Sequence, residues 1–127
     1  MVRLMLNEFS QCVHNAQVER GFYEEKREIG TLLMLIVSEL AEALEADRKG
    51  RHCPNGVAKE IYEESVRLRG CSSAFEGRVK DTFEDEIADT LIRLFDLVGY
   101  LGIDIDSHIQ AKLVYNTTRG HRHGQKY

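Results

Sequence analysis

The apolar residues of this chain recur at intervals of three and four, and this periodicity restricts the fold more than any other feature. It is clearest between residues 82 and 101, where the apolar positions are Ile87, Leu91, Leu94, Val98 and Leu101. Such spacing places the side chains on one face of a helix and is typical of a seam in a helix bundle. The single proline among 127 residues also favours long helices.

Similar patterns predict more helices. They cover residues 2–20, residues 29–49 and a last segment that Asp104 or Asp106 caps. Residues 32–37 are apolar on every side of their helix, which predicts a central, buried position.

The least regular region is residues 50–80, which contain the proline and four glycines. We predict an inserted, partly mobile loop there, with a short amphipathic helix around residues 57–68. The predicted architecture is an all-α bundle of four or five helices, in a single domain over residues 1–127.

Composition excludes several classes of protein. A hydrophobic content of 43% suits one compact soluble domain. The longest apolar run, residues 32–37, is much shorter than the roughly 18–20 residues of a membrane span. The start of the chain lacks a signal-peptide pattern, and the three cysteines form no C-x-x-C pair. We therefore expect a cytoplasmic protein with no membrane partner.

The net charge of −4 is unevenly distributed, because no acidic side chain follows Asp106. The basic residues beyond it are Lys112, Arg119, Arg122 and Lys126. An acidic chain argues against a nucleic acid as partner. A basic tail over residues 120–127 suits a small anion held with a metal, although a solubilising, frayed C-terminus is the alternative.

Two carboxylates lie on an apolar helix face. Glu39 and Glu42 are three residues apart, so they share a face, and the rest of that stripe is apolar: Leu32, Leu35 and Ala46. Two like charges beside a buried surface are costly unless a cation, a hydrogen-bond donor or protonation compensates them.

A second pair, Glu86 and Asp89, has the same spacing, and Arg93 and Asp96 continue its stripe. Four carboxylates from two antiparallel helices would form an all-oxygen site that suits Mg²⁺, with Mn²⁺ also possible. The alternative is a solvated charged stripe, which applies more to the second pair than to the first.

Other metals fit the sequence less well. A di-iron site would require E-x-x-H on two helices, and neither helix has a histidine there. A zinc site would have to use residues at irregular spacing, namely His52, Cys53, Cys71 and His121.

Three blocks of sequence resemble a known family. Residues 35–45 (LIVSELAEALE) and 85–89 (DEIAD) look like the E-x-x-E and E-x-x-D blocks of the MazG-like all-α nucleoside triphosphate pyrophosphohydrolases. These are relatives of the phosphoribosyl-ATP pyrophosphatases and of the helical dCTP and dUTP hydrolases. Residues 112–119 (KLVYNTTR), followed by His123 and Gly124, resemble the K-x-x-x-N-x-x-R stretch of the family's last helix.

The resemblance implies that Glu39, Glu42, Glu86 and Asp89 bind Mg²⁺ and form the catalytic site. It also implies that Lys112, Asn116 and Arg119 bind the triphosphate or the sugar; from the residues alone, an exposed basic helix end is the alternative. The implied reaction is hydrolysis of a (deoxy)nucleoside triphosphate to the monophosphate and pyrophosphate by metal-activated water.

Several details stay open within that resemblance. Glu42 or Glu45 could assist deprotonation of the water. The 43 residues between Glu42 and Glu86 exceed the connection in simpler members of the family, so residues 50–80 could be an added helix or lid. The resemblance further implies a homodimer or a homotetramer.

Two residues near the start of the chain are candidates for base recognition. Phe22 could stack on a base and His14 could hydrogen-bond a base edge, with core packing and a structural role as the respective alternatives. Two other functions also stay open. They are a non-catalytic helical interaction module, and the same fold acting on another pyrophosphate-bearing metabolite such as a phosphoribosyl nucleotide.

Overall fold

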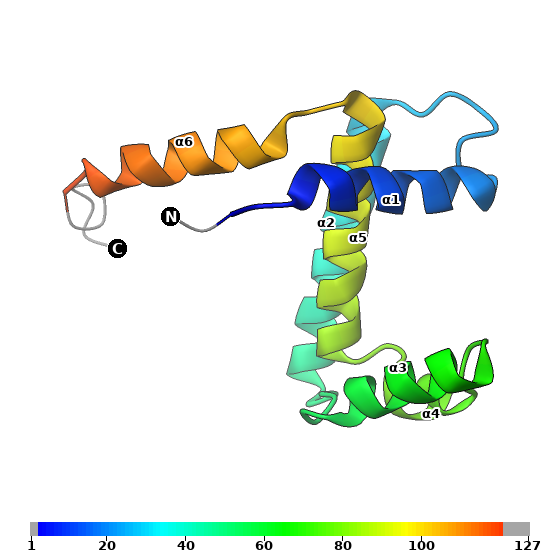
Figure 1. Ribbon diagram of the computed structural model, residues 1–127. Coiled ribbons are helices and arrows are strands. Elements are labelled where there is room, and N and C mark those ends of the chain that lie inside the picture. The colour runs from blue at the N-terminus through cyan, green and yellow to red at the C-terminus, as the bar shows by residue number, and fades with distance from the viewer. Residues whose placement is uncertain (1–2, 121–127) are drawn as a thin grey trace. The chain divides into compact units, whose positions relative to one another are not determined.

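The computed structural model describes residues 3–120 and shows six helices there (Figure 1). They are α1 (Leu6–Glu19), α2 (Ile29–Arg48), α3 (Val57–Leu68), α4 (Ala74–Arg78), α5 (Phe83–Leu101) and α6 (Ile105–Thr117). The predicted all-α class is confirmed, since no strand occurs within residues 3–120. The helix count is six rather than four or five. No helix in this part of the chain is long and apolar enough to cross a membrane.

The region predicted as a partly mobile loop contains two helices and a small core of its own. The predicted helix over residues 57–68 is present as α3, and α4 follows it. Cys53, Ile61 and Val79 are buried together, and the partly buried side chains around them are Val57, Ala74 and Phe75. The glycines do not prevent helices here; Gly56 adopts a φ of 93° immediately before α3 begins.

The chain divides into two compact units, and α5 runs through both. Unit 1 comprises Met1–Glu25 and Phe95–Tyr127, and unit 2 comprises Lys26–Leu94. The single domain predicted from the sequence stays a prediction. Residues 121–127, which make up most of the predicted basic tail, lie outside the described residues.

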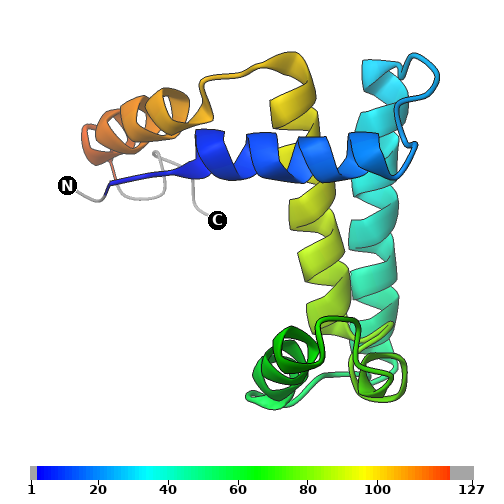
Figure 2. The ribbon, with the colours of Figure 1, turned by 45° about the vertical axis from the view of Figure 1, so that its right-hand side comes forward.

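In unit 2, α2 and the part of α5 before Phe95 lie side by side and run in opposite directions (Figure 2). The buried side chains of α2 recur every three or four residues: Leu32, Ile36, Glu39, Ala43 and Ala46. This is the periodicity of one covered helix face.

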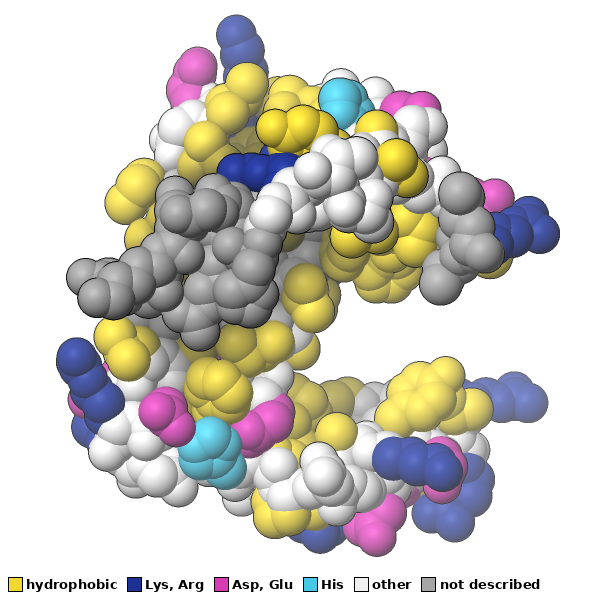
Figure 3. All heavy atoms as spheres, turned by 90° about the vertical axis from the view of Figure 1, so that its left-hand side faces the viewer, with side chains coloured by type: hydrophobic (Ala, Val, Ile, Leu, Met, Phe, Trp, Pro, Cys, Tyr) yellow, Lys and Arg dark blue, Asp and Glu magenta, His cyan; other side chains and the backbone are white. Residues whose placement is uncertain are grey.

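Most of the other large apolar side chains of α2 are exposed, and Figure 3 shows many hydrophobic side chains at the surface of the molecule. Those of α2 with exposed fractions between 46% and 63% are Ile29, Leu33, Met34, Val37, Leu40 and Leu44. The expectation that residues 32–37 are buried on every side is therefore wrong for the isolated chain, because only one face of α2 is covered. The predicted α5 seam is likewise only partly buried, since Leu91, Leu94 and Leu101 are 40–47% exposed.

In unit 1, the starts of α1 and α6 stabilise each other. Asp104 caps α6 by accepting a hydrogen bond from the Ser107 N–H. Of the two predicted caps, Asp104 and Asp106, the first is therefore confirmed. Asp106 instead accepts the Leu6 N–H at 2.8 Å, at the start of α1. Because the first N–H groups of a helix lack intrahelical partners, this contact between residues 100 positions apart fixes the beginning of α1.

A glycine allows α1 to approach α5 closely. A Cβ at Gly99 would lie 2.5 Å from the Ser10 carbonyl oxygen and 2.7 Å from the His14 Cβ. Both distances are shorter than van der Waals contact, so only glycine permits this packing.

Candidate metal centre

Three of the four predicted carboxylates converge in unit 2. Glu39 and Glu42 lie on α2 and Glu86 lies on α5, and each offers an oxygen atom within 4.8 Å of the others. Glu39 and Glu86 are only 8% and 5% exposed, whereas Glu42 is exposed. The spacing of the two pairs in the sequence thus brings together carboxylates that are partly removed from water.

Glu86 carries the largest electrostatic penalty of the group. Its Oε2 atom is buried and has no hydrogen-bond partner among the described residues. Burial, together with the neighbouring carboxyls of Glu39 and Glu42, raises the pKa of Glu86 to about 8. At neutral pH the metal-free protein therefore keeps Glu86 mostly protonated, and a nearby positive charge would favour its ionised form.

Arg93 compensates Glu39. Its Nε–H donates to Oε1 of Glu39 at 2.8 Å, from α5 to α2. Burial alone would raise the pKa of Glu39, but the hydrogen bond and charge of Arg93, with hydrogen bonds from the Glu86 and Glu42 carboxyls, lower it below its ordinary value. Glu39 is therefore held ionised and in a fixed orientation.

Asp89, the fourth predicted ligand, does not belong to this group of converging oxygens. Burial raises its pKa, and the charges of Asp85, Glu39 and Glu42 raise it further. Asp89 thus lies in the electrostatic field of the centre, and its role as a metal ligand stays a prediction.

A second acidic group, which the sequence analysis missed, shares Glu86. Asp81, Asp85 and Glu86 each offer an oxygen within 4.8 Å of the others. Asp81 precedes α5 and has a φ of 64°, which is uncommon for a residue other than glycine. The signal in the sequence was the run of acidic residues at 81, 84, 85 and 86, but periodicity says nothing about a residue outside a helix.

A cavity of about 210 Å³ borders both groups. Its lining residues are Glu42, Glu45, Arg51, Asp81 and Glu86. The cavity therefore combines two carboxylates of the centre, Glu42 and Glu86, with one guanidinium group. Arg51 makes no ion pair within the described part of the chain, so this guanidinium is free to meet an anion.

The backbone of Arg51 is fixed at both ends. Its N–H donates to the Ala46 carbonyl at 2.8 Å, and its carbonyl accepts the Phe83 N–H at 2.9 Å. The segment that follows α2 is thereby attached to the start of α5. This places Arg51 beside the cavity without a long flexible connection.

The next two residues strengthen the same attachment. The His52 ring bridges Glu84 and Asp47: its Nδ1 lies 2.9 Å from a Glu84 oxygen and its Nε2 lies 2.9 Å from an Asp47 oxygen. The Cys53 N–H donates to Glu84. The hydrogen bonds with Glu84 and Asp47 raise the pKa of His52. The ring of His52, considered above as a zinc ligand, is thus engaged by two carboxylates, and His121 lies outside the described residues.

The predicted phosphate-binding residues lie on α6, in unit 1. Lys112 and Arg119 are exposed and approach the ring of Tyr115, at 4.9 and 5.4 Å from its centroid. Asn116 is half-buried, and its Oδ1 atom has no partner among residues 3–120. Because the carboxylates belong to unit 2, joint binding of one substrate by the two sets stays a prediction.

His14 and Phe22, the candidates for base recognition, belong to a polar and aromatic cluster in unit 1. His14 Nδ1 lies 3.0 Å from Asp96 Oδ1, and the Tyr23 hydroxyl donates to Asp96 Oδ2 at 2.6 Å. The rings of Phe22 and Tyr100 pack against Tyr23, with centroid distances of 5.1 and 4.7 Å. Asp96, which the sequence analysis assigned to the carboxylate stripe, is buried and orients His14 instead. Contact of His14 or Phe22 with a base stays a prediction.

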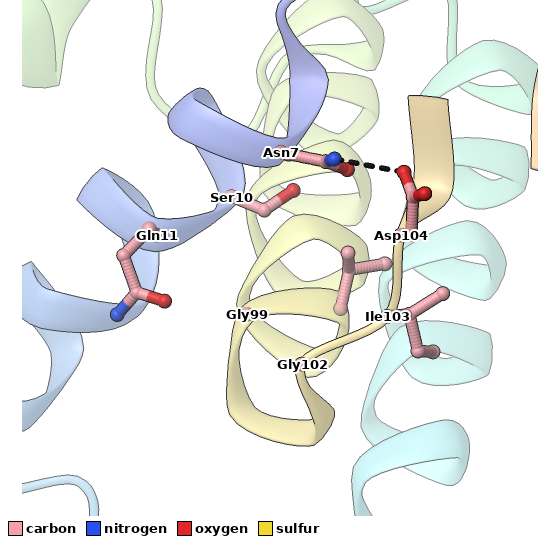
Figure 4. Close-up of a pocket in the computed structure, with 8 residues that line it drawn as sticks. Asn7, Ser10, Gln11, Gly99, Gly102, Ile103 and Asp104 are labelled. Carbon is pink, nitrogen blue, oxygen red and sulfur yellow. Dashed lines mark hydrogen bonds between the residues drawn. The ribbon is translucent and has the colours of Figure 1, made fainter. Parts of the chain in front are cut away.

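A separate cavity of about 250 Å³ lies within unit 1 (Figure 4). It is lined by Asn7, Ser10, Gln11, Val98, Gly99, Gly102, Ile103 and Asp104. The Asn7 amide donates to Asp104 at 2.9 Å, and the Gln11 amide donates to Asn15 at 2.8 Å. The amide donors of Asn7 and Gln11 are thus engaged with neighbouring side chains, whereas the buried Ser10 hydroxyl lacks a partner among the described residues.

Comparison with known proteins adds no relative to this description. No family model, curated protein or solved structure matches the chain. The similarity to the MazG-like proteins therefore depends on the three sequence blocks alone.

Proposed function

We propose that this protein is a Mg²⁺-dependent pyrophosphohydrolase that converts (deoxy)nucleoside triphosphates to the monophosphate and pyrophosphate. The observation that carries the proposal is the convergence of Glu39, Glu42 and Glu86, with a buried Glu86 oxygen that has no partner in the described structure. Removal of surplus or non-standard nucleotides is the physiological role that fits this activity.

The residues suit a hard divalent cation. All the converging donors are carboxylate oxygens, which Mg²⁺ and Mn²⁺ prefer over the softer ligands of zinc or copper. The raised pKa of Glu86 supports the same conclusion, because a cation would relieve the repulsion that keeps this carboxyl protonated. When bound, Mg²⁺ would supply positive charge against phosphate oxygens and lower the pKa of a water molecule.

Other residues of the chain would orient a metal ligand, accept a proton and bind phosphate oxygens. Arg93 holds Glu39 in place by the 2.8 Å contact. Glu45 borders the cavity outside the group of converging oxygens, so it is better placed than Glu42 to accept a proton from the attacking water. Arg51 borders the same cavity and offers a planar donor group that matches phosphate oxygens.

Recognition of the rest of the substrate is proposed from the family resemblance. Lys112, Asn116 and Arg119 would bind the triphosphate or the sugar, and Phe22 and His14 would contact the base. The position of His14 is defined by Asp96, which is a prerequisite for selective hydrogen bonding to a base edge.

Self-association in the cytoplasm, as a homodimer or homotetramer, completes the proposal. Four of the exposed residues of α2 are spaced by four, three and four positions: Leu33, Val37, Leu40 and Leu44. This is the spacing of a helix-pairing seam, and exposed apolar patches of this kind mark interaction sites. A second copy covering α2 would account for the apolar residues that one chain leaves exposed. Leu40→Arg should then yield monomers in light scattering.

The proposal is tested by assaying pyrophosphate release from a panel of ribo- and deoxyribonucleoside triphosphates with Mg²⁺ or Mn²⁺. Release that a chelator stops and that Glu86→Gln abolishes supports it. No release from any compound contradicts it and favours a helical interaction module. Release only from phosphoribosyl nucleotides, added to the same panel, would keep the fold and chemistry but change the substrate.

A further inference from the structure

We propose that His52 is a positioning residue: its ring holds the segment after α2 against α5, so that the Arg51 guanidinium lies beside the cavity and binds the pyrophosphate part of the substrate. This inference rests on the proposed function for the class of substrate. It adds a residue outside the three sequence blocks and makes substrate binding depend on pH.

The backbone turn that ends α2 determines where Arg51 lies. Gly50 has a φ of 67°, and its N–H donates to the Asp47 carbonyl at 2.9 Å. The Arg51 N–H donates to the Ala46 carbonyl at 2.8 Å. A left-handed glycine with these two hydrogen bonds is the Schellman motif, which commonly ends a helix. Arg51 therefore follows a defined turn, and it lines the cavity of the candidate metal centre.

The His52 ring connects the end of α2 with the start of α5. Each ring nitrogen lies 2.9 Å from a carboxylate oxygen, one of Glu84 and the other of Asp47. An ionised carboxylate only accepts hydrogen bonds, so a ring that faces two of them must donate from both nitrogens, as only the protonated imidazole does. The hydrogen bonds with Glu84 and Asp47 accordingly raise the pKa of His52. The bridge is therefore complete only while His52 is charged.

The surroundings of the ring explain what its loss would do. Within residues 3–120, the charged groups that face it are Asp47 on α2 and Glu84 on α5, and the Phe83 ring packs against it with a centroid distance of 5.1 Å. Without a positive charge between them, the two carboxylates repel each other. That repulsion acts on the end of α2 and on the start of α5, which are the two elements between which Arg51 is held.

The contacts on either side of His52 show that Arg51 would feel this change. The Arg51 carbonyl accepts the Phe83 N–H at 2.9 Å, and the Cys53 N–H donates to Glu84. Phe83 and Glu84 are the first two residues of α5. The ring thus lies between two contacts that attach the segment to α5, and it adds a link back to α2.

Arg51 has the chemistry to bind a pyrophosphate. Its exposed guanidinium makes no ion pair within the described part of the chain. A planar guanidinium can donate to two phosphate oxygens at once. Because a long side chain loses much freedom on binding, a fixed backbone favours the bound state. The carboxylates of the same cavity repel a free anion, so we expect pyrophosphate to bind there together with Mg²⁺.

The probe is inorganic pyrophosphate with saturating Mg²⁺. Calorimetry on the full chain gives its dissociation constant at about pH 6 and about pH 9, on either side of the titration of His52, which NMR of the ring follows. Each variant is compared with the wild type at the same pH, so that the titration of pyrophosphate and of Glu86 cancels. His108→Gln, at an exposed position on α6, is the control for loss of a histidine. Circular dichroism reports whether the helices are intact.

Arg51→Met should weaken binding by about 10-fold or more at both pH values, and Arg51→Lys should restore only part of the affinity. His52→Gln should weaken binding by about 3-fold at the lower pH and have little effect at the higher pH. His108→Gln should have no effect at either pH. In the Arg51→Met background His52→Gln should cause no further loss, because His52 acts through Arg51.

Glu84→Gln separates positioning from the simple effect of charge. The glutamine keeps an oxygen that can accept the Cys53 N–H but removes one negative charge near the cavity. Charge alone therefore predicts tighter binding of an anion. Loss of the bridge to His52 instead predicts binding that is weaker by about 3-fold at the lower pH.

The inference is overturned by wild-type affinity in Arg51→Met, by tighter binding in Glu84→Gln, or by an equal effect of His52→Gln with and without Arg51. Absence of pyrophosphate binding by the wild type overturns it too. None of these results affects the proposed function if pyrophosphate is still released from a triphosphate with Mg²⁺. Conversely, the expected pattern of binding, without release from any compound of the panel, supports the inference and contradicts the proposed function.

Discussion

Arg93 donates its Nε–H to Oε1 of Glu39 at 2.8 Å, and so joins α5 to α2 within a group of carboxylates. The side chain of Glu39 is 10% exposed and that of Arg93 is 29% exposed, so solvent screens the pair only in part. The pair keeps Glu39 ionised while Glu86, a few ångströms away, takes up a proton. One buried carboxylate thus has an internal counter-charge, whereas the other is neutralised by a proton.

Replacing Arg93 by Met should lower the free energy of unfolding of the metal-free protein by about 2 kcal/mol, because Glu39 loses its partner and remains buried. Urea denaturation in the presence of a chelator measures the change. Arg67→Met, at an exposed site on α3, is the control and should change stability by less than about 0.5 kcal/mol. Equal effects of the two substitutions would contradict the role of Arg93.

The stability of the metal-free protein should fall as the pH rises. The pKa of Glu86 is about 8 in the folded protein, against an ordinary value of 4.5. The folded state therefore binds this proton more tightly than the unfolded state, and the free energy of unfolding decreases between these two pH values. Urea denaturation at about pH 6 and about pH 9 tests the slope. Glu86→Gln should reduce it; an unchanged slope would show that another group is responsible.

Mg²⁺ should counteract this loss of stability. A cation that binds only the folded protein raises the unfolding temperature in proportion to its binding, so Mg²⁺ should stabilise the wild type most at alkaline pH. Glu86→Gln and Glu39→Gln keep the side-chain volume but remove ligand charge, and Mg²⁺ should leave their unfolding temperatures unchanged. Thermal unfolding with Mg²⁺ and with a chelator gives the comparison. Equal stabilisation of all three proteins would place the cation elsewhere.

His52 should stabilise unit 2 at low pH only. Hydrogen bonds with Glu84 and Asp47 raise the folded-state pKa of His52 above its ordinary value of 6.5. The contribution of His52 to the free energy of unfolding is therefore complete below pH 6.5, and it disappears as the pH rises through the folded-state pKa. His52→Gln should destabilise the protein at about pH 6 and have little effect at about pH 9. His108→Gln, at an exposed position on α6, is the control for loss of a histidine. A constant difference from the wild type at both pH values would contradict this explanation.

Gly99→Ala should disrupt the contact between α1 and α5. The new Cβ would lie 2.5 Å from the Ser10 carbonyl oxygen, so the free energy of unfolding should fall by about 1–3 kcal/mol. Gly30→Ala, in α2, meets nothing within 4 Å and should be neutral or stabilising by up to about 1 kcal/mol. Chemical denaturation of both variants gives the comparison. If Gly99→Ala were as stable as Gly30→Ala, the close packing of α1 on α5 would be wrong.

The helices were largely predictable because each buries one periodic face. The predicted range of residues 29–49 differs from α2 by a single residue, and α3 has the predicted bounds. The order within residues 50–80 was not predictable from periodicity. It depends on Cys53, Ile61 and Val79, which are far apart in the sequence and meet only after the chain has folded.

The candidate site was predictable where it lies on helices. Spacing within α2 and α5 identified Glu39, Glu42 and Glu86, because residues three apart share a helix face. Spacing alone does not identify Asp81, because its position depends on a left-handed backbone conformation before α5.

The predicted stripe of Glu86, Asp89, Arg93 and Asp96 on one helix face does not form a single site. A helical stripe predicts a shared direction but not shared partners, and the side chains of Arg93 and Asp96 have different ones. Arg93 pairs with Glu39, whereas Asp96 accepts hydrogen bonds from Tyr23 and contacts His14.

The central claim is that converging carboxylates support cleavage of a nucleoside triphosphate to the monophosphate and pyrophosphate. The most direct measurement is phosphorus NMR of the products formed from a triphosphate panel by the wild type and by Glu86→Gln, with Mg²⁺ and with chelator. We predict monophosphate and pyrophosphate from the wild type with Mg²⁺ only, and a rate lower by about 100-fold or more for Glu86→Gln. Diphosphate and orthophosphate as products, or equal turnover by Glu86→Gln, would contradict the claim.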